Sequence, residues 1–347
     1  MRFIAPLALL ALVAACADRN SEPPEPLGIA DVSAFPANAS LMRAEDGVIL
    51  SDGRVIVADQ AHGLRAVNPD GSSAPFGRFA EAGYVNSAEI PAGPNGVAFT
   101  PDRRHILVAD IYTGAIWRVS TSDESVEKVH QHAYGVNSAI EDASGAIWFT
   151  QSAANVPGRD SEAGMFGAID RPIPNGKLYR IQGLSLSLMK DGLAFANGLA
   201  IDAQRSRLYV AETMADRVWV FDLDPAQPEK LGEGRAFATV ATPDNVKIGR
   251  GGLVYVASPI ESALVAISPD SGAARTYFSG QTAESAAIAR EWKRRAAGGE
   301  GVIDLFTPAV WGTLPGAVTS VILDDNGEPA YLGNLGNALI KFEEKKR

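Results

Sequence analysis

The order of apolar and polar positions along this chain repeats one phrase six times. Each copy opens near an acidic, amide or hydroxyl residue and continues into a short apolar run. It then turns at polar or glycine residues and enters a second apolar run. Short runs rich in Val, Ile and aromatic residues between such turns are typical of β-strands. The copies begin at Glu45, Pro94, Val136, Ala196, Pro243 and Thr319.

A third apolar run follows each copy, as residues 217–221 follow the fourth copy, and a weaker fourth strand completes the repeat. Three or four strands recurring every ~40 to 60 residues are typical of a propeller blade. We therefore predict an all-β fold, a six-bladed β-propeller over residues 36–347. A β-sandwich is the alternative for many short strands, but it does not predict copies of a single phrase.

Two stretches interrupt the repeat. Residues 152–175 are rich in Gly and Pro and predict a loop, whereas residues 281–297 predict a helical insertion. Long excursions from a regular scaffold often shape a binding pocket. The helix could equally pack against the side of a blade, and the sequence leaves both interpretations open.

Residues with side-chain oxygens occupy the same place in every copy of the phrase. The innermost strands of a propeller run along its central channel, so the residues just before them should converge at one mouth. Asn–Gly pairs are also common in plain turns, which explains Asn95 and Asn197 individually but explains Glu45 and Asn137 less well. We therefore predict a channel ring made of Glu45, Asn95, Asn137, Asn197, Asp244, Asn245 and Thr319 or Ser320.

Two carboxylates and several amide oxygens predict a site for a hard cation. Ca²⁺ accepts six to eight oxygens in loose geometry, while Mg²⁺ requires a tighter octahedron. The ring contains no His or Cys, which disfavours zinc and copper. We predict one Ca²⁺ ion in the channel.

The composition agrees with an exported globular domain that does not bind nucleic acid. The apolar fraction of 46 % suffices for a large core. The net charge of −10, without a basic cluster, argues against nucleic acid as a partner. Cys16 is the only cysteine, so no internal disulfide forms.

The first residues predict a targeting segment. Arg2 precedes an apolar run over residues 3–15, which is too short for a permanent membrane span. The run ends in small residues before Cys16, which resembles a bacterial lipoprotein signal; an ordinary secretory signal with a chance cysteine is the alternative. We predict a signal peptide over residues 1–16, lipidation of Cys16, and a Pro-rich tether over residues 17–35. Ala17 favours the bacterial outer membrane, with the lipid-anchored domain facing the periplasm.

The ring positions and their flanking residues resemble the calcium-dependent six-bladed propellers of the SMP-30/gluconolactonase, paraoxonase and strictosidine-synthase-like group. The resemblance lies in the segments 45–50, 94–97, 136–137, 196–198 and 243–246. It implies Ca²⁺ ligation by Glu45, Asn137, Asn197, Asp244 and Asn245. It also implies that the ion polarises the carbonyl group of a lactone or ester.

The chain departs from the paraoxonase pattern at Asn95, Ser138 and Ser258, and Ser258 stands where paraoxonases have another His. Asn95 stands where paraoxonases have a catalytic His, and an amide cannot serve as a base. Ser138 stands where they have an Asp that binds a second calcium ion, although Asp46 is retained, so the second ion stays open. Asp244, Glu45 and His132 are the remaining candidates for the catalytic base, and Asn95 and Asn137 are candidates for substrate binding.

We therefore predict a calcium-dependent hydrolase of small-molecule lactones or aryl esters. The alternative is a non-enzymatic envelope propeller that serves as a binding or interaction module, since fold alone does not fix function. Metal-free condensation or lyase chemistry, as in strictosidine synthases, would need a late acidic base, and neither Glu261 nor Glu328 is persuasively placed. The sequence identifies no protein partner.

Overall fold

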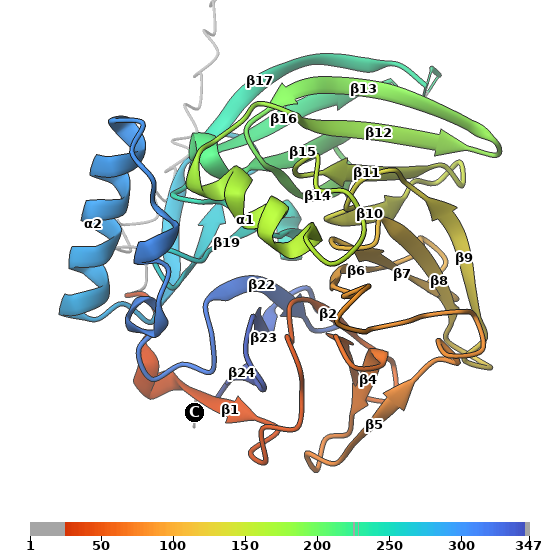
Figure 1. Cartoon of the computed structure of the whole chain (residues 1–347), viewed down its shortest axis with the longest axis horizontal. Helices are drawn as coiled ribbons and strands as arrows, with labels where there is room; N and C mark the ends of the chain where they lie inside the picture. The colour runs from red at the N-terminus through yellow and green to blue at the C-terminus, as the bar shows by residue number, and fades with distance from the viewer. Residues whose placement is uncertain (1–24, 225, 228, 344–347) are drawn as a thin grey trace, which may run out of the picture.

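The computed structural model of this chain describes residues 25–224, 226–227 and 229–343. It is a six-bladed β-propeller in which every blade is a four-stranded antiparallel sheet (Figure 1). The prediction of six blades is confirmed. The signal segment and Cys16 lie outside the described residues, so lipidation and envelope location stay predictions.

The blades follow one another along the chain, and the first strand of each lies at the channel. Blade 1 contains β2 (Gly47–Ile49), β3 (Val55–Asp59), β4 (Gly63–Val67) and β5 (Ser73–Phe76). Blade 2 contains β6 (Pro94–Phe99), β7 (His105–Asp110), β8 (Ala115–Ser120) and β9 (Val126–Gln131). Blade 3 contains β10 (Ser138–Glu141), β11 (Ile147–Gln151), β12 (Gly176–Gln182) and β13 (Ser185–Leu193).

The second half repeats this arrangement. Blade 4 contains β14 (Ala196–Asp202), β15 (Arg207–Glu212), β16 (Arg217–Leu223) and β17 (Leu231–Thr239). Blade 5 contains β18 (Val246–Ile248), β19 (Val254–Ser258), β20 (Ala263–Ile267) and β21 (Ala274–Ser279). Blade 6 contains β22 (Val318–Leu323), β23 (Pro329–Asn334), β24 (Leu339–Phe342) and, as its outermost strand, β1 (Val32–Phe35).

The outermost strand of blade 6 comes from the opposite end of the chain. β1 pairs with β24 so that Val32 lies opposite Phe342 and Phe35 opposite Leu339. Before it, the backbone N–H of Leu27 donates to the carbonyl of Tyr277 in blade 5 at 2.9 Å. The predicted tether over residues 17–35 is therefore wrong for its last part, because residues 27–35 belong to the propeller. The short run of β1 carries no copy of the repeated phrase, which is why the sequence hid it.

The core lies between neighbouring blades, whose middle strands are buried on both faces. All five residues of each of the strands β3, β19 and β20 are buried. Such strands lack the polar alternation of a one-sided sheet and read as continuous apolar runs.

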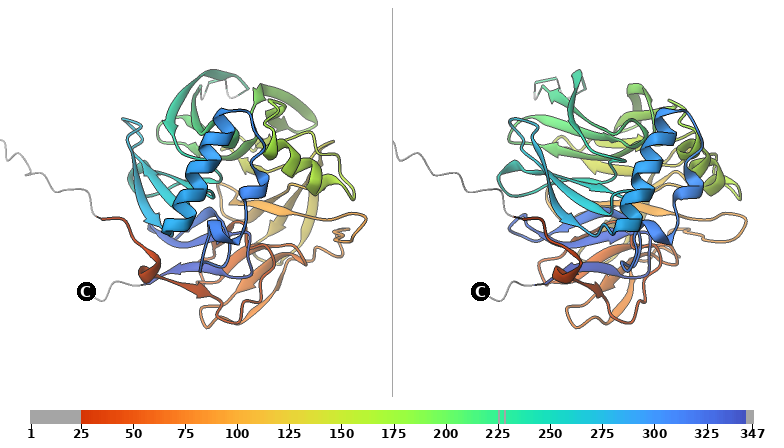
Figure 2. Two further views of the ribbon diagram at one scale, coloured as in Figure 1. Left: turned by 60° about the vertical axis from the view of Figure 1, so that its left-hand side comes forward. Right: turned by 90° about the vertical axis from the view of Figure 1, so that its left-hand side faces the viewer.

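Two helices cover one face of the propeller (Figure 2). α2 (Ala283–Ala297) confirms the predicted helical insertion, and Thr282 caps it by accepting the N–H of Ser285 at 3.1 Å. α1 (Ser161–Asp170) lies within the stretch that the sequence predicted as a loop. Short 3₁₀ helices include η2 (Thr213–Ala215), η4 (Ile303–Leu305) and η5 (Pro308–Val310), with η1 (Ile29–Asp31) and η3 (Arg250–Gly252) elsewhere. Within the described residues, no helix combines the length and apolar character needed to cross a bilayer.

Candidate active site

All the residues of the predicted channel ring lie at the beginnings of the innermost strands and are buried. Their exposed fractions run from 0 % at Ser320 to 8 % at Asp244. Each of the six blades contributes at least one of them. The residues that share one position in the repeated phrase therefore do lie together at one end of the channel.

A circle of hydrogen bonds joins each blade to the next at this level. Asn95, for example, donates its Nδ2 to the carbonyl of Asn137 at 3.1 Å, and Thr319 donates its Oγ1 to the carbonyl of Glu45 at 2.8 Å. The linking residues, from blade 1 round to blade 6, are Arg43, Asn95, Thr150, Thr213, Asn245 and Thr319. The ring is thus held by its own blades, and its side chains are fixed before any ligand enters.

The ring forms the floor of a cavity of about 430 Å³. Glu45, Asn137, Asn197 and Asp244, which are four of the five predicted calcium ligands, line this cavity together with Asn95. Asn245 does not line it; this residue is 2 % exposed and its Nδ2 has no hydrogen-bond partner among the described residues.

Three ring oxygens that face this region have no hydrogen-bond partner in the described part of the chain. They are Glu45 Oε2, Asn197 Oδ1 and Asp244 Oδ1. Buried polar atoms are nearly always paired, so an unpaired group requires an explanation such as an ion or a water molecule. The donor set of two carboxylates and amide oxygens fits Ca²⁺ better than a softer metal. No group of three or more His, Cys, Asp or Glu side chains is placed for a metal within the described residues, so amide oxygens would have to complete any site.

Burial destabilises the charged form of both carboxylates of the ring. Burial raises the pKa of Glu45 to about 7, an effect that neighbouring Arg43 opposes. Burial and the charge of Glu45 raise the pKa of Asp244 well above its usual range. A divalent cation between them would reverse this effect, because a nearby positive charge favours the ionised form.

Arg43 is a site residue that the sequence analysis missed. Its Nη1 donates to the carbonyl of Pro94 at 2.9 Å, and its Nη2 donates to Asn95 Oδ1 at 2.8 Å. Nη2 also lies 3.5 Å from Glu45 Oε2. Its backbone has a φ of 59°, a left-handed conformation that is uncommon outside glycine and clusters at functional sites. That conformation directs the side chain across the channel mouth from blade 1 towards blade 2.

Asp46 is paired with a lysine rather than placed in the cavity. Its Oδ2 accepts hydrogen bonds from the ammonium of Lys247 at 2.7 Å and from the backbone N–H of Val97 at 2.8 Å. The same ammonium also donates a hydrogen bond to the carbonyl of Val97 at 2.7 Å. Lys247 lines a second cavity of about 340 Å³, formed by residues further along the innermost strands. The ammonium therefore already supplies a positive charge to the carboxylate that the sequence left open for a second calcium ion.

The two excursions from the repeat form an apolar roof over the cavity, which we define as residues 152–175 and 281–315. α1 contributes Met165, Phe166 and Ile169, and the second excursion contributes Trp292, Ile303 and Phe306. Ile169 packs against the apolar clusters of both excursions. Of the two interpretations left open for the helix, the structure supports pocket formation.

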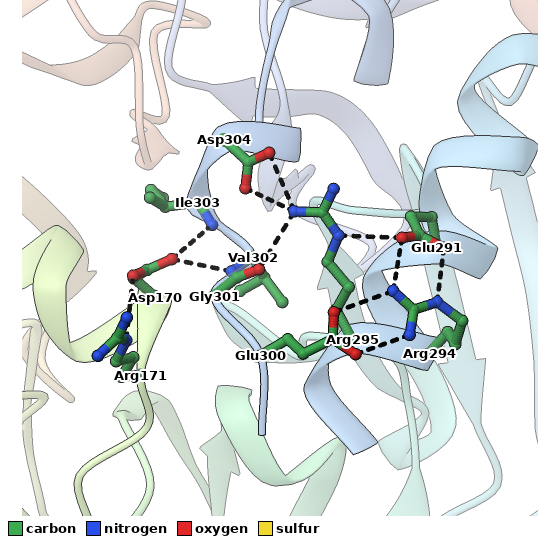
Figure 3. Close-up of polar contacts among 10 residues, drawn as sticks. All are labelled: Asp170, Arg171, Glu291, Arg294, Arg295, Glu300, Gly301, Val302, Ile303 and Asp304. Atoms are coloured by element: carbon green, nitrogen blue, oxygen red, sulfur yellow. Dashed lines mark hydrogen bonds and ion pairs between the residues drawn. The ribbon is translucent and has the colours of Figure 1, made fainter. Parts of the chain in front are cut away.

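A carboxylate at the end of α1 joins the two halves of the roof (Figure 3). Asp170 Oδ1 accepts the backbone N–H groups of Val302 at 2.8 Å and Ile303 at 3.0 Å. Beside it, Arg295 donates to Asp304 at 2.8 Å, and Arg294 bridges Glu291 and Glu300. Asp170 is thus the polar link between segments that are far apart in the sequence.

His132 is not among the residues that line the cavity. It follows β9, the outermost strand of blade 2, whereas Asn137 precedes β10, the innermost strand of blade 3. The few residues between them therefore cross the width of a blade. The Nε2 of His132 lies 2.9 Å from Gln151 Oε1, its ring packs against Phe149 and Tyr179, and burial lowers its pKa. The structure therefore does not bring His132 together with the residues that line the cavity.

Comparison with known sequences finds a family model and a relative that both carry the description gluconolactonase. Residues 123–279 match the family described as SMP-30/gluconolactonase/LRE-like region. A gluconolactonase of Zymomonas mobilis is 27 % identical over 189 residues, which cover 48 % of this chain and 49 % of the relative. The adipocyte plasma membrane-associated protein Hemomucin of Drosophila melanogaster is 29 % identical over 170 residues, covering 44 % and 28 %. The matches thus span about half or less of these curated relatives.

Solved structures share the fold over most of their length. A gluconolactonase of Xanthomonas campestris matches with a TM-score of 0.59 and 17 % identity, covering 87 % of this chain and 86 % of its own. Regucalcin of Agrobacterium tumefaciens, a calcium-binding protein, matches with a TM-score of 0.52 and 13 % identity, covering 73 % and 79 %. At these identities the likeness establishes the propeller fold and no finer property.

Proposed function

We propose that this chain, a member of the SMP-30/gluconolactonase/LRE-like six-bladed propeller family, is a calcium-dependent hydrolase of lactones or aryl esters. The observation that carries the proposal is a set of three buried oxygens without a hydrogen-bond partner in the described part of the chain. They belong to Glu45, Asn197 and Asp244, which line the floor of one cavity. Unpaired buried acceptors of this kind favour a bound cation, and the cavity has room for a small substrate beside it.

In this proposal Glu45, Asn137, Asn197 and Asp244 hold the ion, with Asn245 buried next to them. A bound Ca²⁺ ion would supply Lewis-acid polarisation of the substrate carbonyl. Asn95 positions the substrate or supports Asn137, since its Nδ2 lies 3.2 Å from Asn137 Oδ1. The apolar roof would reduce the contact of the floor with bulk water, which strengthens electrostatic interactions there.

Glu45 and Asp244 are the carboxylates that could accept a proton from the attacking water. Both line the cavity, and no His does so among the described residues. A bound divalent cation would keep such a carboxylate ionised at neutral pH, and an ionised carboxylate can accept a proton from water. A carboxylate can therefore serve as the base where Asn95 cannot.

The test is hydrolysis of phenyl acetate and of a series of lactones by the purified protein. Activity should be lost after chelation and return with added Ca²⁺. Glu45→Gln should lower kcat/KM by about 100-fold or more, since one lost general base typically costs that much. Glu328→Gln, whose side chain is 45 % exposed, is the matched control and should be unchanged.

Absence of turnover on every substrate with Ca²⁺ present would overturn the enzymatic proposal. If metal analysis nevertheless found one calcium ion per chain, the binding-module alternative would be favoured. If neither metal nor turnover were found, both the ion and the reaction would be wrong.

A further inference from the structure

The guanidinium of Arg43 lies at the floor of the cavity, close to the ring carboxylate of Glu45. Its side chain is 12 % exposed, and it lies 5.5 Å from the ring centroid of Tyr112. Two of its N–H groups bind Pro94 and Asn95. An arginine has five N–H donors, so these two hydrogen bonds and the ion pair of Nη2 with Glu45 Oε2 at 3.5 Å leave donor capacity for a ligand.

The carboxylates around Arg43 are largely engaged by other groups once a divalent cation is bound. Glu45 and Asp244 together balance a divalent ion, and Asp46 is paired with Lys247 at 2.7 Å. Asp110, which also acts on Arg43, accepts three backbone N–H groups through its Oδ1. Glu162, in α1, accepts the hydroxyl of Tyr112 at 2.9 Å. Arg43 is the one Lys or Arg side chain among the described residues that line the cavity, so it offers a cationic contact to an anionic ligand.

Outside the ring and Arg43, most of the cavity lining is apolar, and the polar side chains Gln60, Tyr112 and Thr213 already donate to protein oxygens. The roof residues Phe166, Ile169 and Phe306 face the floor, and the walls add further apolar side chains. The apolar wall residues are Met42, Ile111, Phe195, Met214, Pro259, Ile260 and Leu335. A ligand with many hydroxyl groups would lose hydrogen bonds to water there without replacing them, whereas a hydrocarbon body would gain from burial.

We propose that the cavity selects an amphipathic acyl compound, with Arg43 binding its anionic oxygen and the roof covering an unsubstituted aliphatic or aromatic body. The inference deepens the proposed function and rests on it for the reaction. Addition of water across the acyl C–O bond of an ester or lactone gives an alcohol and a carboxylic acid, which then releases its proton to solvent. Arg43 would meet the negative charge that develops on the acyl oxygen and would retain the carboxylate product.

The test measures binding rather than turnover. Hexanoate, phenylacetate, gluconate and 1-hexanol are titrated into the wild-type protein by calorimetry in excess Ca²⁺. Gluconate keeps the charge of hexanoate but has a hydroxylated body, and hexanol keeps the body but lacks the charge. We expect hexanoate and phenylacetate to bind at least about 10-fold more tightly than the other two, because each lost contact is of the order of a charged hydrogen bond or two buried methylene groups.

Variants then assign the charge to its residue. Arg43→Gln should weaken hexanoate binding by about 10- to 100-fold and leave hexanol unchanged, with Arg43→Lys in between. The control Arg104→Gln alters a guanidinium whose side chain is 82 % exposed and should have no effect. Calcium content measured on each variant separates loss of the anion contact from loss of the ion.

Gluconate binding as tight as hexanoate, or hexanoate binding that Arg43→Gln leaves unchanged, would overturn the inference. The wild-type series decides the question of ligand class even if Arg43→Gln does not fold. Hexanoate binding without any ester or lactone hydrolysis would overturn the proposed function and leave this inference standing. Hydrolysis of apolar esters that is independent of Arg43 would do the reverse.

Discussion

The ammonium of Lys247 lies 2.7 Å from Oδ2 of Asp46 and so links blade 5 to blade 1 across the channel. The same ammonium reaches the carbonyl of Val97 in blade 2. One side chain therefore joins three blades just beyond the ring. The ammonium of Lys247 therefore supplies a positive charge inside the propeller, between blades 1, 2 and 5.

We predict that Lys247→Met destabilises the protein by about 3 kcal/mol, because removing one partner leaves a buried carboxylate unpaired. Asp46→Asn in the same protein should recover part of that loss. Urea unfolding measures both effects, and Lys230→Met at an exposed turn is the control. Equal stability of Lys247→Met and wild type would show that the pair is not needed. A calcium content of two ions per chain in the wild type would contradict the idea that Lys247 replaces a second ion.

The raised pKa values of the ring predict that the stability of the calcium-free protein falls with rising pH, whereas the affinity for calcium increases. Burial raises the pKa of Glu45 from its ordinary value near 4.5 to about 7, so the folded protein favours the protonated carboxyl. The chelated protein should therefore lose unfolding free energy as the pH rises through this window. Calcium affinity should increase over the same window, because protons compete with the ion. Titrations between pH 5 and 8 measure both, and affinity that is flat across the range would contradict the shift.

His132 provides a prediction of no catalytic effect. His132→Ala should leave kcat and KM of any hydrolysis unchanged, because the ring lies against Phe149 and Tyr179 and away from the cavity lining. It should lower stability by about 1 to 3 kcal/mol, since the packing and the contact with Gln151 are lost. Steady-state kinetics and thermal unfolding of one sample give both numbers. A drop in kcat at unchanged stability would return His132 to the list of candidate bases.

Asp170 provides a prediction about the roof. Asp170→Ala removes the acceptor of two backbone N–H groups and should loosen the segment 298–303. We expect KM to rise by about 10-fold with little change in kcat, because only the closed fraction of molecules would bind substrate. Limited proteolysis should cut that segment faster. Asp325→Ala, on an exposed turn, is the matched control, and equal protease resistance of Asp170→Ala and wild type would contradict the link.

The repeat made the fold and most of the ring predictable, because one position in six similar phrases must converge in a propeller. It did not predict Arg43, which precedes the first phrase and has no counterpart in the others. Lys247 was readable in principle. It is a lone charge between Val246 and Ile248 in an innermost strand, which indicates a side chain directed into the channel.

The roof was harder to predict because tertiary contacts determine it. α1 contains Gly164 and Gly167, which weaken helix propensity, and it forms against the apolar cluster around Ile111 and Phe195. Asp170 carries no sequence signal, since its partners are backbone N–H groups far along the chain. The distance of His132 from the ring depended on which strand of its blade it follows, and spacing along the chain does not reveal that.

The pairing of β1 with β24 also constrains how the protein is made. β1 leaves the ribosome before the other strands of the propeller, and its partner leaves after them. Until blade 6 has been synthesised, the first and the last completed blades have no neighbour to close the ring, and their exposed surfaces and strand edges stay available to other chains. A nascent chain that stalls before blade 6 is complete would therefore present an incomplete array of blades with exposed strand edges, so this protein should depend on chaperones most strongly until β24 has been synthesised.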